Sequence, residues 1–388
     1  MSAKNTMSCK HLHLCIVSKQ PTPNIVPLLD QHLQVDEVIL IHTNSFKIQA
    51  QRLAKALQYY QIKSQLIPLS HYQTPAELRE FFIQLVDTLL SKNENIRLYA
   101  NLTGGTKSMS LALYEVALMT ESDGTHAYYM NTDDTLIWYL PKSKADSAPY
   151  DLEDRIKLTP FLIAHGWKPL TKPKGTDHPQ WRPLTEQLLN HIEDWQQPLT
   201  QLNFIATNAK NKELRSKPPH PLNAPLKRLI DLLQDAGLLQ LENNTVQFSD
   251  DDARFFCNGG WLEEAVFHAL KQLSSKNRKI QDYAQGLEIQ FDLSNTQNEL
   301  DAVALVDNKL VIIECKTHNT KANPKILRDS LFKLGSLIEN IGGVMARGLL
   351  ISMHTPSKSD FKRAEQLQIP IIYGKQIAQL KTHLAKHL

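Results

Sequence analysis

The sequence is poor in cysteine, and its few cysteines are scattered. Cys9, Cys15, Cys257 and Cys315 form no Cys-x-x-Cys pair, so neither a disulfide framework nor a cysteine-based zinc site is expected. No apolar run approaches the roughly 20 residues that span a bilayer, and the N-terminus lacks the apolar stretch of a secretory signal. We therefore expect a cytoplasmic protein with no membrane contact.

A large excess of charge of one sign is also missing. The chain carries 43 Lys and Arg residues against 40 Asp and Glu residues, which gives a net charge of +3. Because the protein is not polycationic as a whole, any nucleic-acid binding must depend on local basic clusters. The 388 residues are enough for two or three domains, and no internal repeat or low-complexity tract interrupts them.

The most informative stretch is 299–317, in which a two-residue turn joins two apolar runs. Leu300–Val306 and Leu310–Ile313 flank Asp307-Asn308, a pair typical of a tight hairpin. If Val306 pairs with Lys309, the register places Asp301 directly opposite Glu314. Since side chains alternate along a strand, Lys316 shares the face of Glu314.

Two carboxylates and a lysine at one end of a hairpin suit metal-dependent hydrolysis of a phosphodiester. Mg²⁺ and Mn²⁺ prefer carboxylate oxygens, with water or phosphate completing the shell. The lysine can orient or deprotonate water, or stabilise charge that develops on phosphate. The alternative is that Asp301 and Glu314 are solvated, as most hairpin carboxylates are. The position of Glu314 and Lys316 at the exit of an apolar strand favours a site.

A predicted helix that precedes the hairpin also carries acidic residues. Residues 259–270 place apolar side chains at helical spacing and include Glu263 and Glu264. Both glutamates are candidates to join the carboxylates of the hairpin. The alternative is that both glutamates only favour the positive end of the helix.

The first third of the chain alternates short apolar strands with helical segments such as Phe46–Gln58 and Pro75–Ser91. This order predicts a mostly parallel, Rossmann-like sheet with helices on both faces. The last two strands are expected to form an antiparallel hairpin around Asp133-Asp134. The expected strands are His11–Ser18, Glu37–Thr43, Gln65–Leu69, Ile96–Asn101, His126–Asn131 and Thr135–Leu140.

The polar loops after these strands predict an anion site at the carboxyl edge of the sheet. In the loop before helix Lys107–Met119, two glycines let backbone N–H groups face an anion, and the helix N-terminus favours negative charge. The loop matches neither a P-loop nor a dinucleotide fingerprint, and a purely structural turn is the alternative. The expected ligand-binding residues are Ser18, Lys19, Thr43, Asn44, Ser45, Asn101, Thr103, Gly104, Gly105, Thr106, Lys107 and Ser108.

The middle of the chain separates these two regions. Prolines recur from Pro141 to Pro183, which is typical of a connector. An amphipathic helix at Leu226–Ala236 and two strands around Asn243-Asn244 then predict a winged-helix-like module, or alternatively a packing or dimerisation module. The last third follows an αβββαβ order. We predict an α/β protein with three parts: 1–145, a connector at 146–252, and 253–388.

The motif of Asp301 with Glu314-Cys315-Lys316 resembles the PD-(D/E)xK nuclease superfamily, although Leu300 replaces the proline that names it. The strand followed by Thr-Gly-Gly-Thr-Lys and a helix resembles the CARF domain, the cyclic-oligoadenylate sensor of type III CRISPR systems. The combination is similar to the CRISPR ancillary nuclease family over nearly the whole chain.

This resemblance implies a nuclease that a cyclic oligoadenylate activates. It implies a homodimer formed through the CARF domains, cyclic tetra-adenylate as ligand, and RNA or DNA as substrate. It further implies Mn²⁺ or Mg²⁺ held by Asp301, Glu314 and Glu263, with Lys316 completing the catalytic set. One rival is a ligand-sensing, DNA-binding regulator with a degenerate nuclease fold. Another is a restriction or repair nuclease that senses a different ligand. RNA or DNA preference, activator ring size and the number of metal ions stay open.

Overall fold

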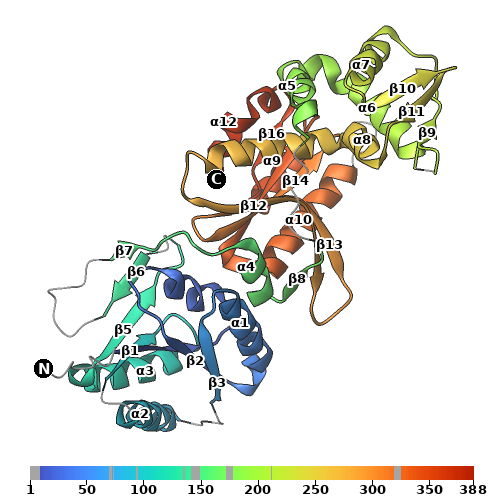
Figure 1. Cartoon of the computed structure of the whole chain (residues 1–388). Coiled ribbons are helices and arrows are strands. Elements are labelled where there is room, and N and C mark those ends of the chain that lie inside the picture. The colour runs from blue at the N-terminus through green and yellow to red at the C-terminus, as the bar shows by residue number, and fades with distance from the viewer. Residues whose placement is uncertain are drawn as a thin grey trace, which may run out of the picture. The chain divides into compact units, whose positions relative to one another are not determined.

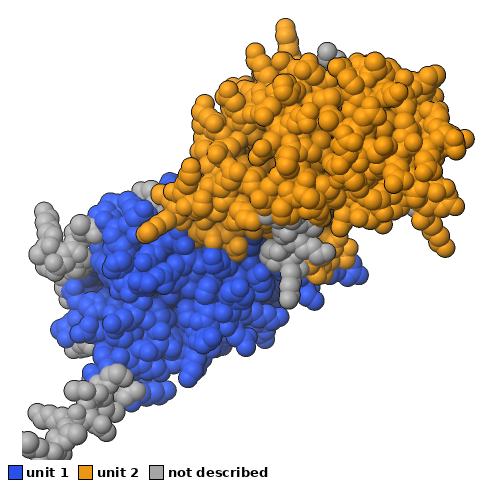
Figure 2. All heavy atoms as spheres, turned by 45° about the horizontal axis from the view of Figure 1, so that its top comes forward, with its two compact units in different colours: residues 1–169, 290–296, 341–345 blue, residues 170–289, 297–340, 346–388 orange. Residues whose placement is uncertain are grey.

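A computed structural model describes residues 9–69, 72, 74–92, 95–133, 136–140, 149–171, 178–210, 212–318 and 325–388. These residues form two compact units (Figure 2). Unit 1 comprises 1–169 with 290–296 and 341–345, and unit 2 comprises the rest. The expected turn residue Asp134, the first residue of the expected strand Thr135, and Pro141 lie outside the described residues.

Unit 1 is built on a seven-stranded sheet in the order β3-β2-β1-β4-β5-β6-β7 (Figure 1). The first five strands in this order are parallel, and β6 and β7 are antiparallel additions. The predicted Rossmann-like sheet and its terminal hairpin are confirmed, with strand ends within two residues of those expected. The strands are β1 Lys10–Ile16, β2 Glu37–His42, β3 Lys63–Pro68, β4 Ile96–Asn101, β5 Thr125–Met130, β6 Leu136–Tyr139 and β7 Tyr150–Asp151.

The helices of unit 1 cover this sheet because one face of each is apolar. The helices are α1 Lys47–Tyr59, α2 Pro75–Ser91, α3 Lys107–Met119 and α4 Leu158–Ala164. Helices α2 and α3 share one apolar core with strands β1, β2 and β4, in which Phe82, Leu113 and Leu14 are fully buried. Strand β8, Trp167–Pro169, ends the N-terminal part of this unit.

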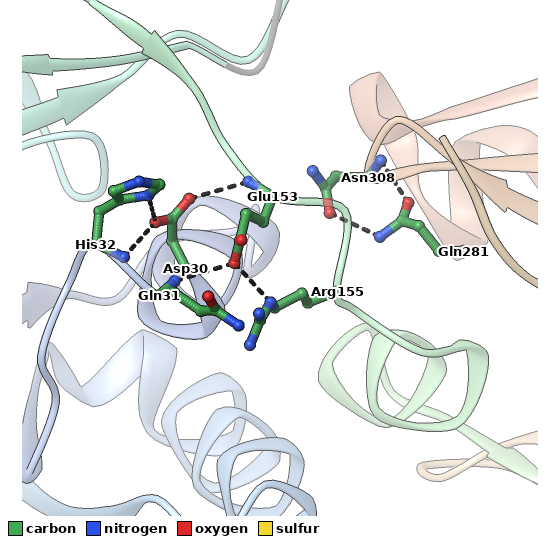
Figure 3. A network of polar contacts seen from close by, with 7 residues as sticks. All are labelled: Asp30, Gln31, His32, Glu153, Arg155, Gln281 and Asn308. Carbon is green, nitrogen blue, oxygen red and sulfur yellow. Dashed lines mark hydrogen bonds and ion pairs between the residues drawn. The ribbon is translucent and has the colours of Figure 1, made fainter. Parts of the chain in front are cut away.

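Hydrogen bonds explain why residues near 150 belong to unit 1. The Asp30 carboxylate accepts from the backbone N–H groups of Glu153 and His32 at 2.9 and 2.8 Å, and Arg155 pairs with Glu153 at 2.6 Å (Figure 3). Segment 290–296 is held in the same unit by Arg52, whose Nε donates to Asp292 Oδ2 at 2.8 Å. Unit 1 therefore extends beyond 145, and the three-part division of the chain stays a prediction.

Unit 2 is built around a mixed sheet whose strands lie in the order β16-β15-β14-β13-β12 (Figure 1). Strands β13 and β14 are antiparallel, whereas β14, β15 and β16 are parallel. The predicted αβββαβ order is confirmed. The elements are α8 Asp251–Phe255, α9 Trp261–Ser274, β12 Ile280–Phe291, β13 Gln297–Val306, β14 Lys309–Lys316, α10 Lys325–Ile341, β15 Ala346–Ser352, α11 Lys358–Gln366, β16 Ile371–Tyr373 and α12 Leu380–Ala385.

The predicted helix and hairpin near residue 240 also form. Strands β10 and β11 pair with each other, and β9 pairs with β11 to complete a three-stranded sheet. Leu229 and Ile230 of this module are buried in the same apolar core as Val266 of α9 and Ile313 of β14. The elements are α5 Arg182–Asn190, α6 Ile192–Asn208, β9 Arg215–Ser216, α7 Ala224–Asp235, β10 Leu239–Glu242 and β11 Thr245–Phe248.

None of the helices in the described part of the chain combines the length and apolar composition that a bilayer crossing requires.

Candidate active site and ligand-binding edge

The hairpin of β13 and β14 brings Asp301 and Glu314 together as its register predicts. Val306 pairs with Lys309 and Ala302 with Ile313, so the next pair is Asp301 with Glu314. Asp307 and Asn308 make the turn with φ of +54° and +59°. Gln281 of β12 donates to Asn308 Oδ1 and accepts from the Asn308 backbone N–H (Figure 3).

These carboxylates are enclosed, not solvated. Glu314 is 2% exposed, and Asp301 Oδ2 accepts a 2.8 Å hydrogen bond from the backbone N–H of Cys315. A buried carboxylate is stable only when a positive charge or hydrogen-bond donors compensate it. The solvated-surface alternative is therefore excluded for Glu314.

Lys316 supplies that positive charge. Its Nζ lies 2.7 Å from Glu314 Oε1, 3.0 Å from the carbonyl oxygen of Cys315 and 3.4 Å from Asp301 Oδ2. Burial by itself lowers the pKa of Lys316, but Asp301 and then Glu314 outweigh it, so the net pKa is raised and the lysine is charged. The Lys316 ammonium group thus lies close to three oxygen atoms, one from β13 and two from β14.

A second lysine, from helix α10, reaches the same carboxylate. Lys333 Nζ lies 3.5 Å from Glu314 Oε2, although its side chain is 42% exposed. The sequence favours a solvated lysine at this position, since nothing local relates residue 333 to residue 314. Glu299, which is exposed on β13 two residues before Asp301, was not among the predicted site residues. Partial burial and then Asp301 raise its pKa.

Glu263 faces this cluster from helix α9. Within the described residues its Oε2 is enclosed and has no hydrogen-bond partner. Burial, followed by the Asp301, Glu299 and Glu314 carboxylates, raises the pKa of Glu263 well above its ordinary value, and Lys316 opposes this. Glu264 instead accepts from His178 Nδ1 at 2.8 Å. The geometry therefore distinguishes the two glutamates.

A buried clamp joins the strand that carries Lys316 to the helix that carries Glu263. Gly259, just before α9, has φ of +105°, and a Cβ there would lie 2.3 Å from Thr317 Oγ1. Asn203 of α6 accepts from Thr317 Oγ1 at 3.0 Å and donates to the carbonyl oxygens of Cys257 and Leu199 at 3.2 Å. Sequence reasoning missed Asn203 and Thr317, because only the fold brings them together.

The donor set fits a hard divalent cation. Among the described residues, no three His, Cys, Asp or Glu side chains gather closely enough to form a complete metal site. Asp301, Glu314 and the carbonyl oxygen of Cys315 nevertheless surround one positive charge, and the enclosed Oε2 of Glu263 has no hydrogen-bond partner among the described residues. Oxygen-only ligands of this kind are those that Mg²⁺ and Mn²⁺ prefer.

In unit 1, the predicted ligand residues gather at the carboxyl edge of the sheet. Strand order reverses between β1 and β4, which is where open α/β sheets bind ligands. Thr106 caps helix α3 by accepting from the Met109 N–H at 3.3 Å, and no acidic residue occupies the first turn. The exposed members of the predicted set are Lys19, Asn44, Ser45, Thr106, Lys107 and Ser108.

Other members of that set support the loop from inside. Asn101 is fully buried and bonds to the Pro23 carbonyl oxygen, the Asn24 side chain and the Thr103 N–H. Thr103 Oγ1 accepts from the Met130 N–H at 2.8 Å. A Cβ at Gly104 would lie 2.0 Å from the carbonyl oxygen of Ile16, so only glycine fits there. Ser18, Thr43 and Gly105 are half-buried, and Gly105 has φ of +82°.

An open sheet with an anion-suited edge, followed by a buried acid–lysine cluster, defines a sensor domain fused to a nuclease domain. Residues 12–160 match the model of the Card1 CARF domain, and residues 250–388 match that of the Card1-like endonuclease domain. The chain therefore belongs to the CARF–nuclease family, and the resemblance predicted from the sequence is confirmed.

Solved structures agree with this assignment. The chain is similar to protein VC1899 from Vibrio cholerae, at 26% identity and a TM-score of 0.86 over 97% of both chains. It is similar to Can2 from Sulfobacillus thermosulfidooxidans, solved with cyclic tetra-adenylate, at 27% identity and a TM-score of 0.77 over 97% of this chain and 98% of that one.

A type III CRISPR defence DNA nuclease activated by cyclic oligoadenylate shares the fold, at 21% identity and a TM-score of 0.55 over 90% of this chain and 47% of that one. No curated protein matches the sequence.

We predict that Glu263→Gln stabilises the metal-free protein, because it removes a buried charge among other carboxylates. At pH 8 in chelator, the melting temperature should rise by about 2–4 °C, equivalent to roughly 1 kcal/mol. The folded-state pKa of Glu263 is raised, so the wild type loses stability as pH rises through it. The difference in melting temperature between Glu263→Gln and the wild type should therefore vanish as pH falls toward about 4.

Glu264→Gln is the matched control, since it removes the neighbouring carboxylate that His178 already satisfies. The Glu264→Gln variant should not raise the melting temperature. Added Mn²⁺ should stabilise the wild type more than Glu263→Gln. A Glu263→Gln melting temperature at or below that of the wild type at pH 8 would contradict the account of Glu263.

We also predict that the Thr317 hydroxyl positions Lys316 against Glu263. Thr317→Val keeps the side-chain shape but loses the hydrogen bond to Asn203. Turnover should fall about tenfold, the effect of roughly 1.4 kcal/mol, with KM unchanged. Thr317→Ser should restore turnover, because it retains the hydroxyl. Valine and serine variants with equal turnover would show that the hydroxyl has no positioning role.

Proposed function

We propose that this chain is a metal-dependent endonuclease of type III CRISPR defence that a cyclic oligoadenylate activates. The observation that carries the proposal is the cluster at the end of β14, where Lys316 joins Asp301 and Glu314 and faces the unpartnered Glu263. Family membership supports it, and so does the likeness to Can2, which binds cyclic tetra-adenylate.

Asp301, Glu314 and Glu263 would hold Mn²⁺ or Mg²⁺, with Glu263 acting directly or through water. Such a cation supplies Lewis acidity and lowers the pKa of bound water. Lys316 would then turn from the carboxylates toward the attacking water and the scissile phosphate, where its charge stabilises the developing negative charge. Lys333 would add positive charge at Glu314 Oε2, whereas Lys316 lies against Oε1 of the same carboxylate.

The thiol of Cys315 has no part in this chemistry, whereas its carbonyl oxygen belongs to the donor set. Burial raises the pKa of its thiol well above the ordinary value, so the nucleophilic thiolate is not formed. The nucleophile is therefore water. Metal, water and lysine act on the phosphodiester group and read no base, so RNA and DNA are both candidate substrates with little sequence preference.

Cyclic tetra-adenylate would bind at the carboxyl edge of the unit 1 sheet. Its phosphates suit the exposed Thr106, Lys107 and Ser108 at the N-terminus of α3. The ring has internal two-fold symmetry, which matches an isologous dimer in which each chain contributes one edge. Leu111, one turn further along α3, is 67% exposed and would contribute to such a dimer interface.

Activation requires that the ligand bind the active state more tightly than the inactive one. Two segments of the C-terminal half belong to unit 1 and offer a route for this coupling. Segment 290–296 leads into β13 and Asp301, and segment 341–345 directly follows α10 and Lys333. A change in unit 1 would thus act through the chain on both sides of the site.

We predict that Glu314→Gln and Lys316→Gln abolish cleavage and leave cyclic tetra-adenylate binding intact. The assay uses labelled single-stranded RNA and DNA with Mn²⁺, with and without the ligand. Wild-type cleavage should appear only with the ligand. Lys309→Gln, at the other end of β14, is the matched control and should keep activity. Retained cleavage in both site variants would refute the active-site assignment.

A separate prediction concerns the sensor edge. Lys107→Ala should weaken binding of cyclic tetra-adenylate about tenfold or more by calorimetry, because it removes the exposed charge at the α3 N-terminus. Lys55→Ala, an exposed lysine on α1, should bind like the wild type. Wild-type affinity in Lys107→Ala would place the ligand elsewhere, without affecting the nuclease assignment.

A further inference from the structure

One stretch of unit 2 concentrates positive charge. Residues 210–228 contain six Lys or Arg residues and one glutamate, a net charge of +5 in a chain whose total is +3. The remaining residues together are therefore net negative. The cations are Lys210, Lys212, Arg215, Lys217, Lys227 and Arg228, and all six are exposed.

Most of these cations have no acidic partner. With the residues that the structure describes, Lys210, Lys212, Lys217, Lys227 and Arg228 form no ion pair. Lys227 and Arg228 also lie near the N-terminus of α7, which has no acidic residue in its first turn. Positive charge is unfavourable there, so folding does not account for it.

The basic segment is attached at both ends to helix α6. It leaves α6 after Asn208 and returns at Asn223, whose Nδ2 donates to Gln201 Oε1 at 3.3 Å. Gln201, Phe204 and Asn208 share one helical face. Phe204, between the two attachment points, is 52% exposed. The exposed Phe204 therefore lies on α6 between the point where the basic segment leaves the helix and the point where it contacts the helix again.

The adjacent face of α6 contacts the nuclease site. Asn203 hydrogen-bonds Thr317, which follows Lys316 in the chain. Thr207 Oγ1 donates to Asn258 Oδ1 at 2.9 Å, five residues before Glu263. Helix α6 thus contacts residues next to the active site through Asn203 and Thr207, and it exposes Phe204 on the adjacent face.

We propose that Phe204 and the basic cluster of Lys210, Lys212 and Lys217 bind the single-stranded nucleic acid that the site cleaves. The lysines neutralise phosphates, and an unpaired base stacks on the Phe204 ring, which duplex DNA does not allow. The proposal rests on the proposed nuclease function and assigns this surface as the part that holds the substrate strand.

The test is fluorescence anisotropy with labelled single-stranded RNA, single-stranded DNA and duplex DNA, in chelator between 50 and 200 mM salt. The triple variant Lys210→Gln, Lys212→Gln, Lys217→Gln should bind single strands at least tenfold more weakly. Its log–log salt slope should be smaller by about 2, since each phosphate contact contributes about 0.7. Phe204→Ala should weaken binding without changing the slope, and Phe204→Trp should restore it.

The control triple is Lys55→Gln, Lys63→Gln, Lys92→Gln, which makes the same charge change on exposed lysines of unit 1. It should bind like the wild type. Equal affinities and slopes for the two triples would overturn the proposal, and so would duplex binding that exceeds single-strand binding. Matching thermal melts and circular dichroism exclude misfolding as the cause of weaker binding.

Catalysis gives an independent readout. With Mn²⁺ and cyclic tetra-adenylate, the basic-cluster variant should raise KM for long single strands and leave hydrolysis of bis(p-nitrophenyl) phosphate unchanged. A loss of both activities would mean that the lysines support the active site itself, which would overturn the proposed role. Absence of cleavage by the wild type would refute the nuclease function. The metal-free binding assay would still show whether Phe204 and the three lysines bind single-stranded nucleic acid.

Discussion

The arrangement of the nuclease unit depends on compensation of buried negative charge by Lys316. Glu314 follows the apolar run Leu310–Ile313 of β14, and without a cation its burial would be costly. Lys316 meets this need with ion pairs to Glu314 and Asp301. Lys316 offsets the neighbouring acids only in part for Glu263, whose pKa is raised by burial and then by Asp301. A divalent cation bound among these carboxylates would add the missing positive charge.

This charge arrangement also separates the rival functions. A regulator with a degenerate nuclease fold would gain nothing from an unpartnered buried glutamate, whose replacement by glutamine would favour folding. A nuclease needs it, because metal binding requires an excess of negative oxygen ligands. Strain and unmet polar groups commonly mark functional sites for this reason. The Gly259–Thr317–Asn203 clamp also depends on a backbone conformation that residues with a side chain rarely adopt, because Gly259 has a positive φ. This glycine lies against Thr317, which directly follows β14 and is held by a hydrogen bond to Asn203 of α6.

Local patterns predicted much of the fold because they depend on neighbouring residues. The Asp307-Asn308 turn sets the hairpin register, and that register alone brings Asp301 opposite Glu314. Alternation of strands and helices predicted the open sheet of unit 1, and the pair Gly104-Gly105 predicted a tight loop at its carboxyl edge. The same patterns did not reveal that Asn101 is buried and supports the loop, since burial depends on segments that pack from elsewhere.

The sequence by itself determined the elements, the hairpin pair, the family resemblance and the candidate acids, because turn chemistry and side-chain periodicity act over a few residues. Only the tertiary structure decided between Glu263 and Glu264, since the choice depends on which one faces β13 and which one meets His178. It also brings Lys333 to Glu314 and Asn203 to Thr317. Their partners lie 19 and 114 residues away in sequence, and no local pattern encodes contacts over such separations.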